Sequence, residues 1–197
     1  MKSYDIVIVG GGPAGTAAAL FLKKYGYNIA LLDQALFPRD KVCGEFISPA
    51  ADDIFFDLGV LDSINALNPT RLSGVILSAY ENSYLQVDYP DSFDGRTMTS
   101  LSVERSKLDN LMINHVRNSD VDLLEGFKVT DFLFDNGNVC GVKGHDAIKT
   151  KFSIKGKIII DAGGRNSISL RQLNLRRESS GRGRIALAAH WEGARDL

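Results

Sequence analysis

The chain has 197 residues, of which 44% are hydrophobic and 24% are charged, which is an ordinary composition for a globular protein. Its formal net charge of −1 provides no overall field that would favour nucleic acid or an anionic lipid surface. The two cysteines lie far apart, which argues against a disulfide scaffold and fits a reducing compartment. No apolar run approaches the roughly 20 residues that span a bilayer. We therefore expect a cytoplasmic protein and leave peripheral contact with a membrane open.

The first predicted elements form a strand–helix–strand unit. Residues 4–9 end in an uninterrupted run of β-branched apolar side chains, Ile6 to Val9, which is typical of a buried parallel strand. A helix is expected from Pro13 to about Tyr25, with the proline in its first turn and Gly26 at its end. Residues 28–33 give the second strand. The whole has the length of about 30 residues that a βαβ unit requires.

The middle of the chain changes character. Residues 34–50 are predicted to form a loop, and a short helix follows at 50–58. Residues 71–104 alternate between apolar and polar side chains or are rich in β-formers, so they are predicted to form antiparallel strands in a second layer. Turns are expected at Asn82–Ser83 and at Pro90–Gly95.

The remaining elements return to the first layer. Residues 102–119 have helical spacing, and 121–124 are a candidate third parallel strand. Residues 127–145 are predicted to form a hairpin in which Asn136–Gly137 is a two-residue type I′ turn. Residues 157–167 give another buried strand, a glycine turn and the start of a last helix.

The strongest functional signal is the glycine pattern between the first strand and the first helix. Gly10 lets the chain turn tightly, Gly12 leaves space for a pyrophosphate, and Gly15 lets the helix pack closely on the sheet. The helix offers unpaired N–H groups and the positive end of its dipole to the phosphates. Asp33 ends the second strand, 18 residues after Gly15, where a carboxylate can accept hydrogen bonds from both ribose hydroxyls. This acid disfavours a 2′-phosphate, so the sequence predicts FAD or NAD at this site.

In "GGGPAG", Pro13 follows Gly12, the second glycine of the pattern, and the pattern lies near the first residue of the chain. Together these two features favour FAD. At this point the chain resembles the flavoprotein monooxygenase and geranylgeranyl reductase superfamily, which shares the p-hydroxybenzoate hydroxylase fold. The resemblance implies an α/β protein with a Rossmann-like FAD-binding domain of the GR2 or p-hydroxybenzoate hydroxylase type. It implies that 1–197 are one FAD/NAD(P)-binding domain, with 71–104 and 181–197 as parts of an incomplete substrate-side sheet of inserted antiparallel strands.

Three further segments carry this resemblance. Residues 37–51, "FPRDKVCGEFISPAA", are similar to the segment of geranylgeranyl-reductase-like proteins in which a C-G-E element lies near the flavin. Residues 102–112 are similar to a helix start whose arginine, here Arg105, contacts FAD; the alternative is a surface arginine paired with Glu104 or Asp109. Residues 126–132 resemble the strand whose backbone meets the adenine, which points to Val129.

Residues 158–171 resemble the later G-A-D-G-x-x-S element of the superfamily, with one departure. Where aromatic hydroxylases have an aspartate before the second glycine, this chain has Gly163. In the hydroxylases that carboxylate serves both FAD and NADPH. Its absence shifts the expectation from an NADPH-driven aromatic hydroxylase towards the reductase branch.

The candidate catalytic residues are Cys43 and Glu45. Cys43 would lie against the flavin or line a substrate tunnel; the alternative is a small buried residue without a role in the reaction. Glu45 would supply a proton or position the substrate; the alternative is a carboxylate that faces solvent. Arg39 and Lys41 are more typical of exposed loop charges than of an anion site. No histidines have metal-ligand spacing, so no metal is expected. The expected cofactor-binding residues are Gly10, Gly12, Pro13, Ala14, Gly15, Asp33, Gln34, Cys43, Gly44, Arg105, Val129, Asp161 and Gly163.

The resemblance predicts an FAD-dependent oxidoreductase like the geranylgeranyl reductases, in which the flavin, reduced by NAD(P)H or a reduced carrier, transfers hydride to a C=C bond. The alternative is a flavin-dependent monooxygenase or halogenase that uses a C4a-hydroperoxide. The substrate would be a small molecule, an isoprenoid or another lipid among the candidates. The non-enzyme alternative is a truncated FAD-binding module without activity of its own. Because family members continue for about another domain, we expect an N-terminal fragment that needs a C-terminal half or a complementing chain.

Overall fold

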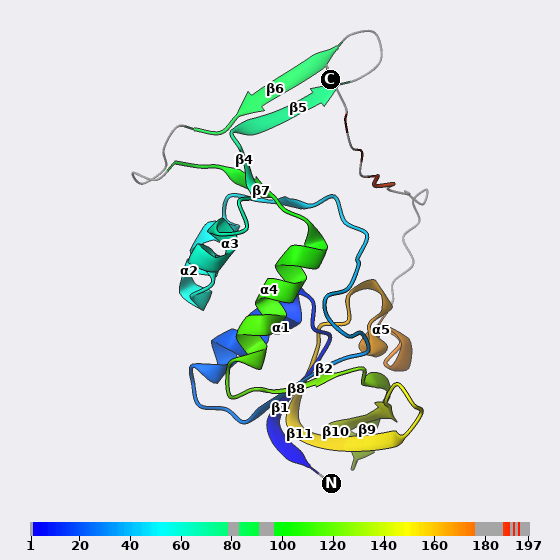
Figure 1. Cartoon of the computed structure of the whole chain (residues 1–197). Coiled ribbons are helices and arrows are strands. Elements are labelled where there is room, and N and C mark those ends of the chain that lie inside the picture. Colours follow the sequence, from blue (N-terminus) through cyan, green and yellow to red (C-terminus); the bar gives the residue numbers. More distant parts are fainter. Residues whose placement is uncertain are drawn as a thin grey trace.

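The computed structural model describes residues 2–78, 83–90, 97–175, 187–189, 191 and 193. Its main layer is a six-stranded sheet (Figure 1), formed in this part of the chain by β1 (Ser3–Val9), β2 (Ile29–Asp33), β8 (Asp122–Glu125), β9 (Lys128–Asp135), β10 (Asn138–His145) and β11 (Lys151–Asp161). The order across the sheet is β8-β2-β1-β11-β10-β9. The first four strands are parallel to one another, and β10 runs antiparallel to both of its neighbours.

The core lies on both faces of this sheet. Ile6 and Ile8 of β1 pack against α1 (Pro13–Lys23) and α4 (Arg105–Arg117), which lie side by side over one face (Figure 1). Val7, between them in the sequence, faces the other way and packs with residues of β9 and β10. Burial on both faces explains why the second half of β1, Ile6 to Val9, contains no polar residue.

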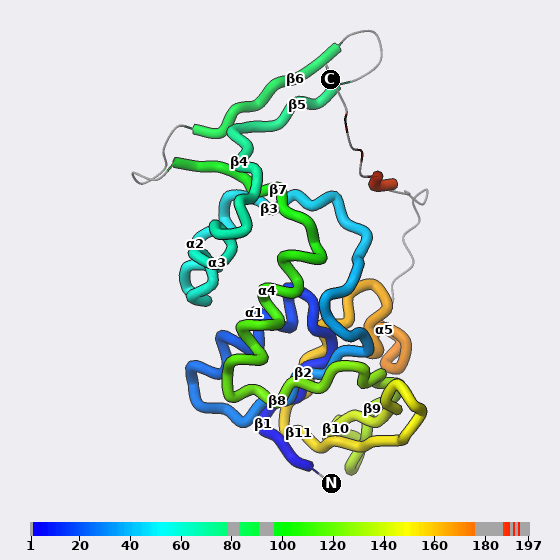
Figure 2. Tube along the Cα trace, in the orientation of Figure 1, coloured from blue at the N-terminus to red at the C-terminus, as the bar shows by residue number. Residues whose placement is uncertain are grey.

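A second, smaller layer lies beyond α4. A three-stranded sheet has the order β3 (Phe46–Ile47), β7 (Ser100–Ser102) and β4 (Thr70–Leu72), and α2 (Ala51–Leu58) and α3 (Leu61–Asn65) lie beside it. The tube in Figure 2 shows a two-stranded hairpin, β5 (Gly74–Ser78) and β6 (Tyr84–Asp88), standing away from the main sheet. After β11 come a 3-10 turn, Gly164–Asn166, and α5 (Ile168–Gln172).

Most predicted elements are confirmed. The strand–helix–strand unit forms as expected, β8 is the third parallel strand beside β2, and the antiparallel strands within 71–104 form the second layer. Asn136 and Gly137 have φ of 47° and 81°, as a type I′ turn requires. These outcomes and the parallel strands of the main sheet confirm the α/β fold class.

Some predicted features differ or lie outside the described residues. The last strand was expected within 157–167 but begins earlier, at Lys151, because its first residues pair antiparallel with β10 before the strand reaches β1. Asn82 and all of the turn predicted at Pro90–Gly95 except Pro90 itself lie outside the described residues. Within 181–197 the few residues described, 187–189, 191 and 193, are not in a strand, so that part of the predicted substrate-side sheet stays a prediction.

Tyr4 links two strands of the sheet that are not neighbours. Its hydroxyl donates a hydrogen bond of 2.6 Å to Oδ2 of Asp122, and burial together with this carboxylate raises the pKa of Tyr4 to about 12. Because the folded-state pKa lies above the ordinary value of about 10, the neutral phenol stabilises the fold fully below pH 10, and this stabilisation is lost as the pH rises towards 12.

We therefore expect Tyr4→Phe to lower the free energy of unfolding by about 1 kcal/mol at pH 8 and to flatten its decline between pH 10 and 12. Urea unfolding across this pH range measures both effects. Tyr27→Phe, at an exposed tyrosine, is the control and should change neither. An unchanged alkaline decline in Tyr4→Phe would contradict the assignment.

Candidate cofactor-binding site

The carboxyl ends of β1, β2 and β11 open into a cleft of about 1360 Å³. This is the edge at which open parallel sheets bind their ligands. Gly15 and Glu45 are not on its wall, whereas the other predicted site residues are. The cleft therefore brings together Gly10, Gly12, Pro13, Ala14, Asp33, Gln34, Cys43, Gly44, Arg105, Val129, Asp161 and Gly163.

Two glycines of the fingerprint hold the first helix tightly against the sheet. Gly10 has φ of 110°, and a Cβ there would lie 2.5 Å from the carbonyl oxygen of Ala162. A Cβ at Gly15 would lie 1.8 Å from the carbonyl oxygen of Gly10. Both positions exclude any side chain, so α1 begins directly at the ends of β1 and β11.

Gly12, unlike Gly10 and Gly15, has open space beside it. Gly12 is the N-cap of α1, with φ of −76° that any residue adopts, and no side chain caps the helix. A Cβ at Gly12 would meet only the Nη2 atom of Arg39, at 3.7 Å, so the space beside it is open. The first hydrogen bond of the helix runs from the Thr16 N–H to the Gly12 oxygen. Because the N–H groups before Thr16 have no partner within the helix, this end fits a bound pyrophosphate.

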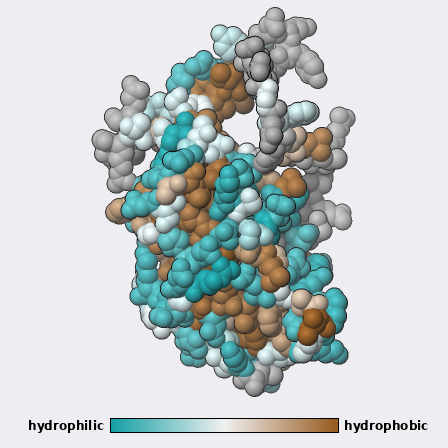
Figure 3. All heavy atoms as spheres, in the orientation of Figure 1, coloured by the Kyte–Doolittle hydropathy of each residue, from teal (hydrophilic) through white to brown (hydrophobic). Residues whose placement is uncertain are grey.

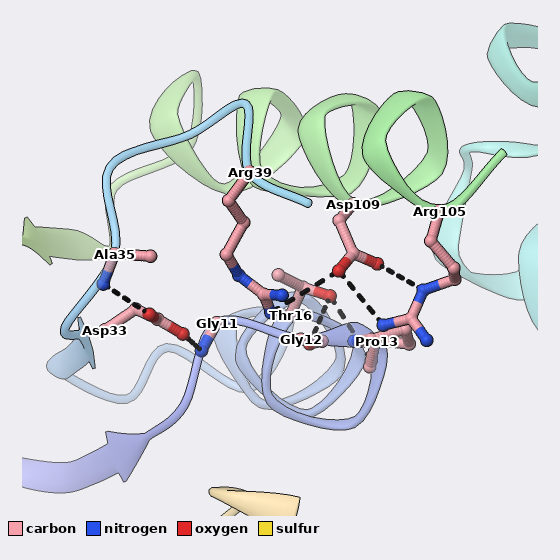
Figure 4. A network of polar contacts seen from close by, with 9 residues as sticks. All are labelled: Gly11, Gly12, Pro13, Thr16, Asp33, Ala35, Arg39, Arg105 and Asp109. Atoms are coloured by element: carbon pink, nitrogen blue, oxygen red, sulfur yellow. Dashed lines mark hydrogen bonds and ion pairs between the residues drawn. The ribbon is translucent and has the colours of Figure 1, made fainter. Parts of the chain in front are cut away.

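Asp33 is nearly buried and rigidly held at the end of β2. Its Oδ2 accepts a hydrogen bond of 2.6 Å from the Gly11 N–H, and its Oδ1 accepts one of 2.8 Å from the Ala35 N–H (Figure 4). Each carboxylate oxygen keeps a further lone pair. The carboxylate can therefore still accept hydrogen bonds from the ribose hydroxyls of a bound dinucleotide.

Two arginines and one buried carboxylate lie above the start of α1 (Figure 4). The Asp109 side chain is 0% exposed, and its two oxygens pair with Nε and Nη2 of Arg105, each at 3.0 Å. Nη2 of Arg39 lies 3.4 Å from Oδ2 of the same carboxylate. Both arginine side chains are 17% exposed, so Arg39 is not the exposed loop charge that the sequence predicted.

Arg105 stays charged in this setting. Burial alone would lower the pKa of its guanidinium, but hydrogen bonds to Asp109 and to Cys43 outweigh it and raise the pKa above its ordinary value. The pairing with Asp109 was the sequence-based alternative to a cofactor contact. The structure shows that pairing on the wall of the cleft, so the two roles are compatible.

Glu45 is not among the residues that line the cleft. Its Oε1 accepts a hydrogen bond of 3.0 Å from the backbone N–H of Arg105, which places a carboxylate at the N-terminus of α4. Its backbone oxygen accepts from the Val103 N–H, and its φ of 55° turns the chain at this point. This position favours a structural role for Glu45, which holds the start of α4, over the predicted proton donor.

Cys43 is on the cleft wall and beside Arg105. A hydrogen bond from the backbone of Glu45, and then one from the Arg105 side chain, lower the pKa of the thiol below its ordinary value. A thiol with a lowered pKa reacts faster with alkylating reagents at neutral pH.

We expect iodoacetamide to alkylate Cys43 faster than Cys140 at pH 7, and added FAD to slow this reaction because Cys43 lines the cleft. Arg105→Gln should move the pH dependence of Cys43 alkylation to higher pH. Peptide mass spectrometry measures both rates, and Cys140 is the internal control. An identical pH profile in the parent and in Arg105→Gln would show that the guanidinium does not act on this thiol.

The turn after β11 explains the departure at Gly163. Oδ1 of Asp161 accepts a hydrogen bond of 3.0 Å from the Gly163 N–H, and its Oδ2 accepts one of 2.6 Å from the Ser169 N–H. A Cβ at Gly163 would lie 3.0 Å from Oδ1 of Asp161 and 3.1 Å from Cα of Ser167. The turn therefore carries its carboxylate at position 161, and there is little room for a second one at position 163.

The cleft is more positive than the chain as a whole. Three acidic residues line it, Asp33, Asp40 and Asp161, against six basic residues. This excess in a concave site attracts an anionic ligand, although the net charge of the chain is −1. The six basic residues are Arg39, Lys41, Arg105, Lys128, Arg165 and Arg171.

From the sequence, Asp109 is only a surface partner of Arg105, four residues along the same helix face. Sequence reasoning missed that Asp109 is buried and that it also pairs with Arg39. Elsewhere in the described ranges, no group of three or more His, Cys, Asp and Glu side chains is placed to hold a metal ion. Nor is any helix among the described residues long and apolar enough to cross a membrane.

Comparison with known families agrees with this geometry. Residues 3–190 match the family described as FAD binding domain. The chain belongs to this family. Its cofactor is therefore FAD, and the open space beside Gly12, the unpaired start of α1 and the excess of cations fit that cofactor. The superfamily of FAD-dependent enzymes that the sequence predicted is confirmed.

Individual relatives include halogenases and a reductase. The chain is 29% identical to 1H-pyrrole-2-carbonyl-(peptidyl-carrier protein) chlorinase of Pseudomonas fluorescens, over 88% of this chain and 42% of the relative. It is 32% identical to menaquinone reductase of Mycolicibacterium smegmatis, over 67% of this chain and 31% of the relative. The structure of the myxobacterial chondrochloren halogenase CndH matches with a TM-score of 0.78 and 25% identity, over 84% of this chain and 38% of that one.

The chain thus spans less than half the length of each of these proteins. The halogenase matches cover more of this chain than the match to the reductase. They support the oxygenase and halogenase alternative better than the main prediction, a geranylgeranyl reductase, which they do not single out.

Proposed function

We propose that this chain is the FAD-binding part of a flavin-dependent halogenase or of a closely related monooxygenase. The observation that carries the proposal is the similarity to a chlorinase over 88% of the chain, supported by the TM-score of 0.78 with a second halogenase. The substrate would be a small molecule, either free or held by a carrier protein, as the name of the chlorinase describes for that relative.

The residues of the cleft would divide the work of holding the cofactor. Gly12 and the start of α1 would receive the pyrophosphate, and Arg39 and Arg105 would neutralise its charge. Asp33 would bind the ribose, and the backbone at Val129 would meet the adenine. Bound FAD, once reduced, supplies the electrons for the reaction with oxygen.

The remaining predicted site residues would lie nearer the reactive end. Cys43 and Gly44, on the segment that runs from Arg39 to α4, would border the reactive end of the cofactor. Asp161 would shape the opposite wall, because it fixes the turn after β11. An external electron donor, NAD(P)H or a reduced carrier, would be needed in either reaction class.

A second candidate function is a reductase. The 32% identity to a menaquinone reductase favours it, over a smaller part of the chain. The missing carboxylate at Gly163 was the sequence feature that pointed the same way. In this case the reduced cofactor would pass its electrons to an organic acceptor such as a quinone or an isoprenoid, and oxygen would not be needed.

We further propose that 71–104 contribute to a substrate-side sheet completed by another part of a longer protein or by a complementing chain. Leu77, Leu85 and Val87 lie on one face of the β5–β6 hairpin and are 59%, 58% and 48% exposed. Figure 3 shows hydrophobic atoms on the visible side of this hairpin. A two-stranded hairpin with an exposed apolar face is marginally stable by itself, so a covering layer would stabilise it.

The two functions can be separated with the FAD-loaded chain. After anaerobic reduction by dithionite, one sample is mixed with air-saturated buffer containing bromide and monochlorodimedone, which reports bromination. A second sample is mixed anaerobically with a water-soluble naphthoquinone. Free reduced FAD is the control in both experiments.

The halogenase proposal predicts bromination above the free-flavin control and no acceleration of quinone reduction. Acceleration by the protein of quinone reduction without bromination would overturn it in favour of the reductase. A chain that binds FAD but does neither would be the module without activity of its own, as expected if the substrate side must come from the rest of a longer protein or from a complementing chain.

A further inference from the structure

We propose that Asp109 is a positioning residue that fixes Arg39 and Arg105 in the geometry that receives the pyrophosphate of FAD. The inference requires only the FAD site and holds whichever reaction the whole protein catalyses. It concerns a carboxylate that does not line the cleft and that would act through the two arginines that do.

The contacts of Asp109 are directional. Both of its oxygens pair with Arg105, at 3.0 Å from Nε and from Nη2, so the plane of the guanidinium is fixed. Arg39 comes from the loop after β2, and its Nη2 lies 3.4 Å from Oδ2 of the same carboxylate. Figure 4 shows both guanidinium groups above the start of α1.

Arg39 lies next to the space in which the pyrophosphate is expected to bind. The atom nearest to a Cβ built at Gly12 is Nη2 of Arg39, at 3.7 Å. Arg39 therefore borders the open space beside Gly12, which is where the fold brings a pyrophosphate close to the backbone. Arg105 lines the same cleft as Arg39 and Gly12, so both arginines and the start of α1 would contact the same anion.

The charge and the geometry of Asp109 have opposite effects on anion binding. Its negative charge repels a nearby phosphate, so removing the charge alone would strengthen the binding of FAD. Its hydrogen bonds hold two flexible arginine side chains in place before the ligand arrives. Ordering such side chains during binding instead would weaken affinity, so the two accounts predict opposite signs.

The test is the affinity of Asp109→Asn for three probes. We expect FAD, measured by quenching of flavin fluorescence, and inorganic pyrophosphate, measured by competition with FAD, to bind about tenfold more weakly. Adenosine, which lacks the phosphates, should compete as well as it does in the parent. A loss for the phosphate-bearing probes alone would not follow from a general loosening of the fold.

The arginines provide the internal check. In a background of Arg39→Gln and Arg105→Gln, adding Asp109→Asn should leave the affinity for FAD unchanged, because the groups that Asp109 positions are gone. Asp120→Asn, at a carboxylate with an 89% exposed side chain, is the matched control and should have no effect.

Asp109→Glu covers the case in which Asp109→Asn fails to fold. Glutamate keeps the charge but moves the carboxylate by one methylene, so positioning predicts a several-fold weaker binding of pyrophosphate, whereas charge alone predicts no change. Tighter binding in Asp109→Asn, unchanged binding in Asp109→Glu, or an equal loss for adenosine would each overturn the proposal.

Discussion

Gly15→Ala is expected to lower the free energy of unfolding by more than about 3 kcal/mol, a large part of the 5–15 kcal/mol that stabilises a typical domain. The added methyl group would lie 1.8 Å from the carbonyl oxygen of Gly10, and a backbone atom cannot move aside as a flexible side chain can. Either α1 must shift away from the sheet or the turn at Gly10 must open. Chemical denaturation followed by circular dichroism measures the loss.

Gly44→Ala is the matched control. A Cβ at Gly44 would meet nothing within 4 Å, so its free energy of unfolding should stay within about 0.5 kcal/mol of the parent. Equal stability of Gly15→Ala and Gly44→Ala would show that α1 does not pack on the Gly10 turn as described.

Gly12→Ala, in contrast to Gly15→Ala, should leave the stability of the fold unchanged and weaken FAD binding by roughly 10- to 100-fold. Gly12 has φ of −76° and no backbone neighbour that a methyl group would strike. The methyl group would instead occupy the open space beside the start of α1, where the pyrophosphate has to approach. Flavin fluorescence titration measures the affinity, and thermal unfolding without FAD tests the fold.

Adenosine separates the effect of Gly12→Ala from a general loss of the site. It carries no pyrophosphate, so its ability to compete with FAD should be the same in the parent and in the variant. Binding of FAD within twofold of the parent would mean that the pyrophosphate does not pass beside Gly12, and the proposed orientation of the cofactor would be wrong.

Local patterns predicted most of the fold. The uninterrupted apolar run of β1, the turn residues Asn136–Gly137 and the glycine spacing at 10–15 each determine structure within a few residues. The extra length of β11 was missed because its first residues are held by β10 rather than by β1, and this pairing depends on the hairpin reaching the sheet. Helix α3 was also missed, since its five residues carry too little periodicity to be recognised.

The site residues that could be predicted are those marked by a local sequence pattern. Gly12 and Asp33 were found because each lies at the end of an element that points to the cleft, and Arg105 was found through the resemblance of its helix start to the family's. Arg39 was judged to be exposed because nothing near it in the sequence indicates burial. Its burial depends on Asp109, which is distant in sequence and reaches it only through the packing of α4 on α1.

The place of β11 in the sheet has a consequence for biosynthesis. β11 lies between β1 and β10, and the carbonyl oxygen of Ala162 just after it closes the back of the Gly10 turn. The fingerprint precedes β11 by about 150 residues along the chain, so the turn at Gly10 is closed by a residue that is made much later than the turn itself. The complete cleft therefore forms only after β11 has inserted between β1 and β10.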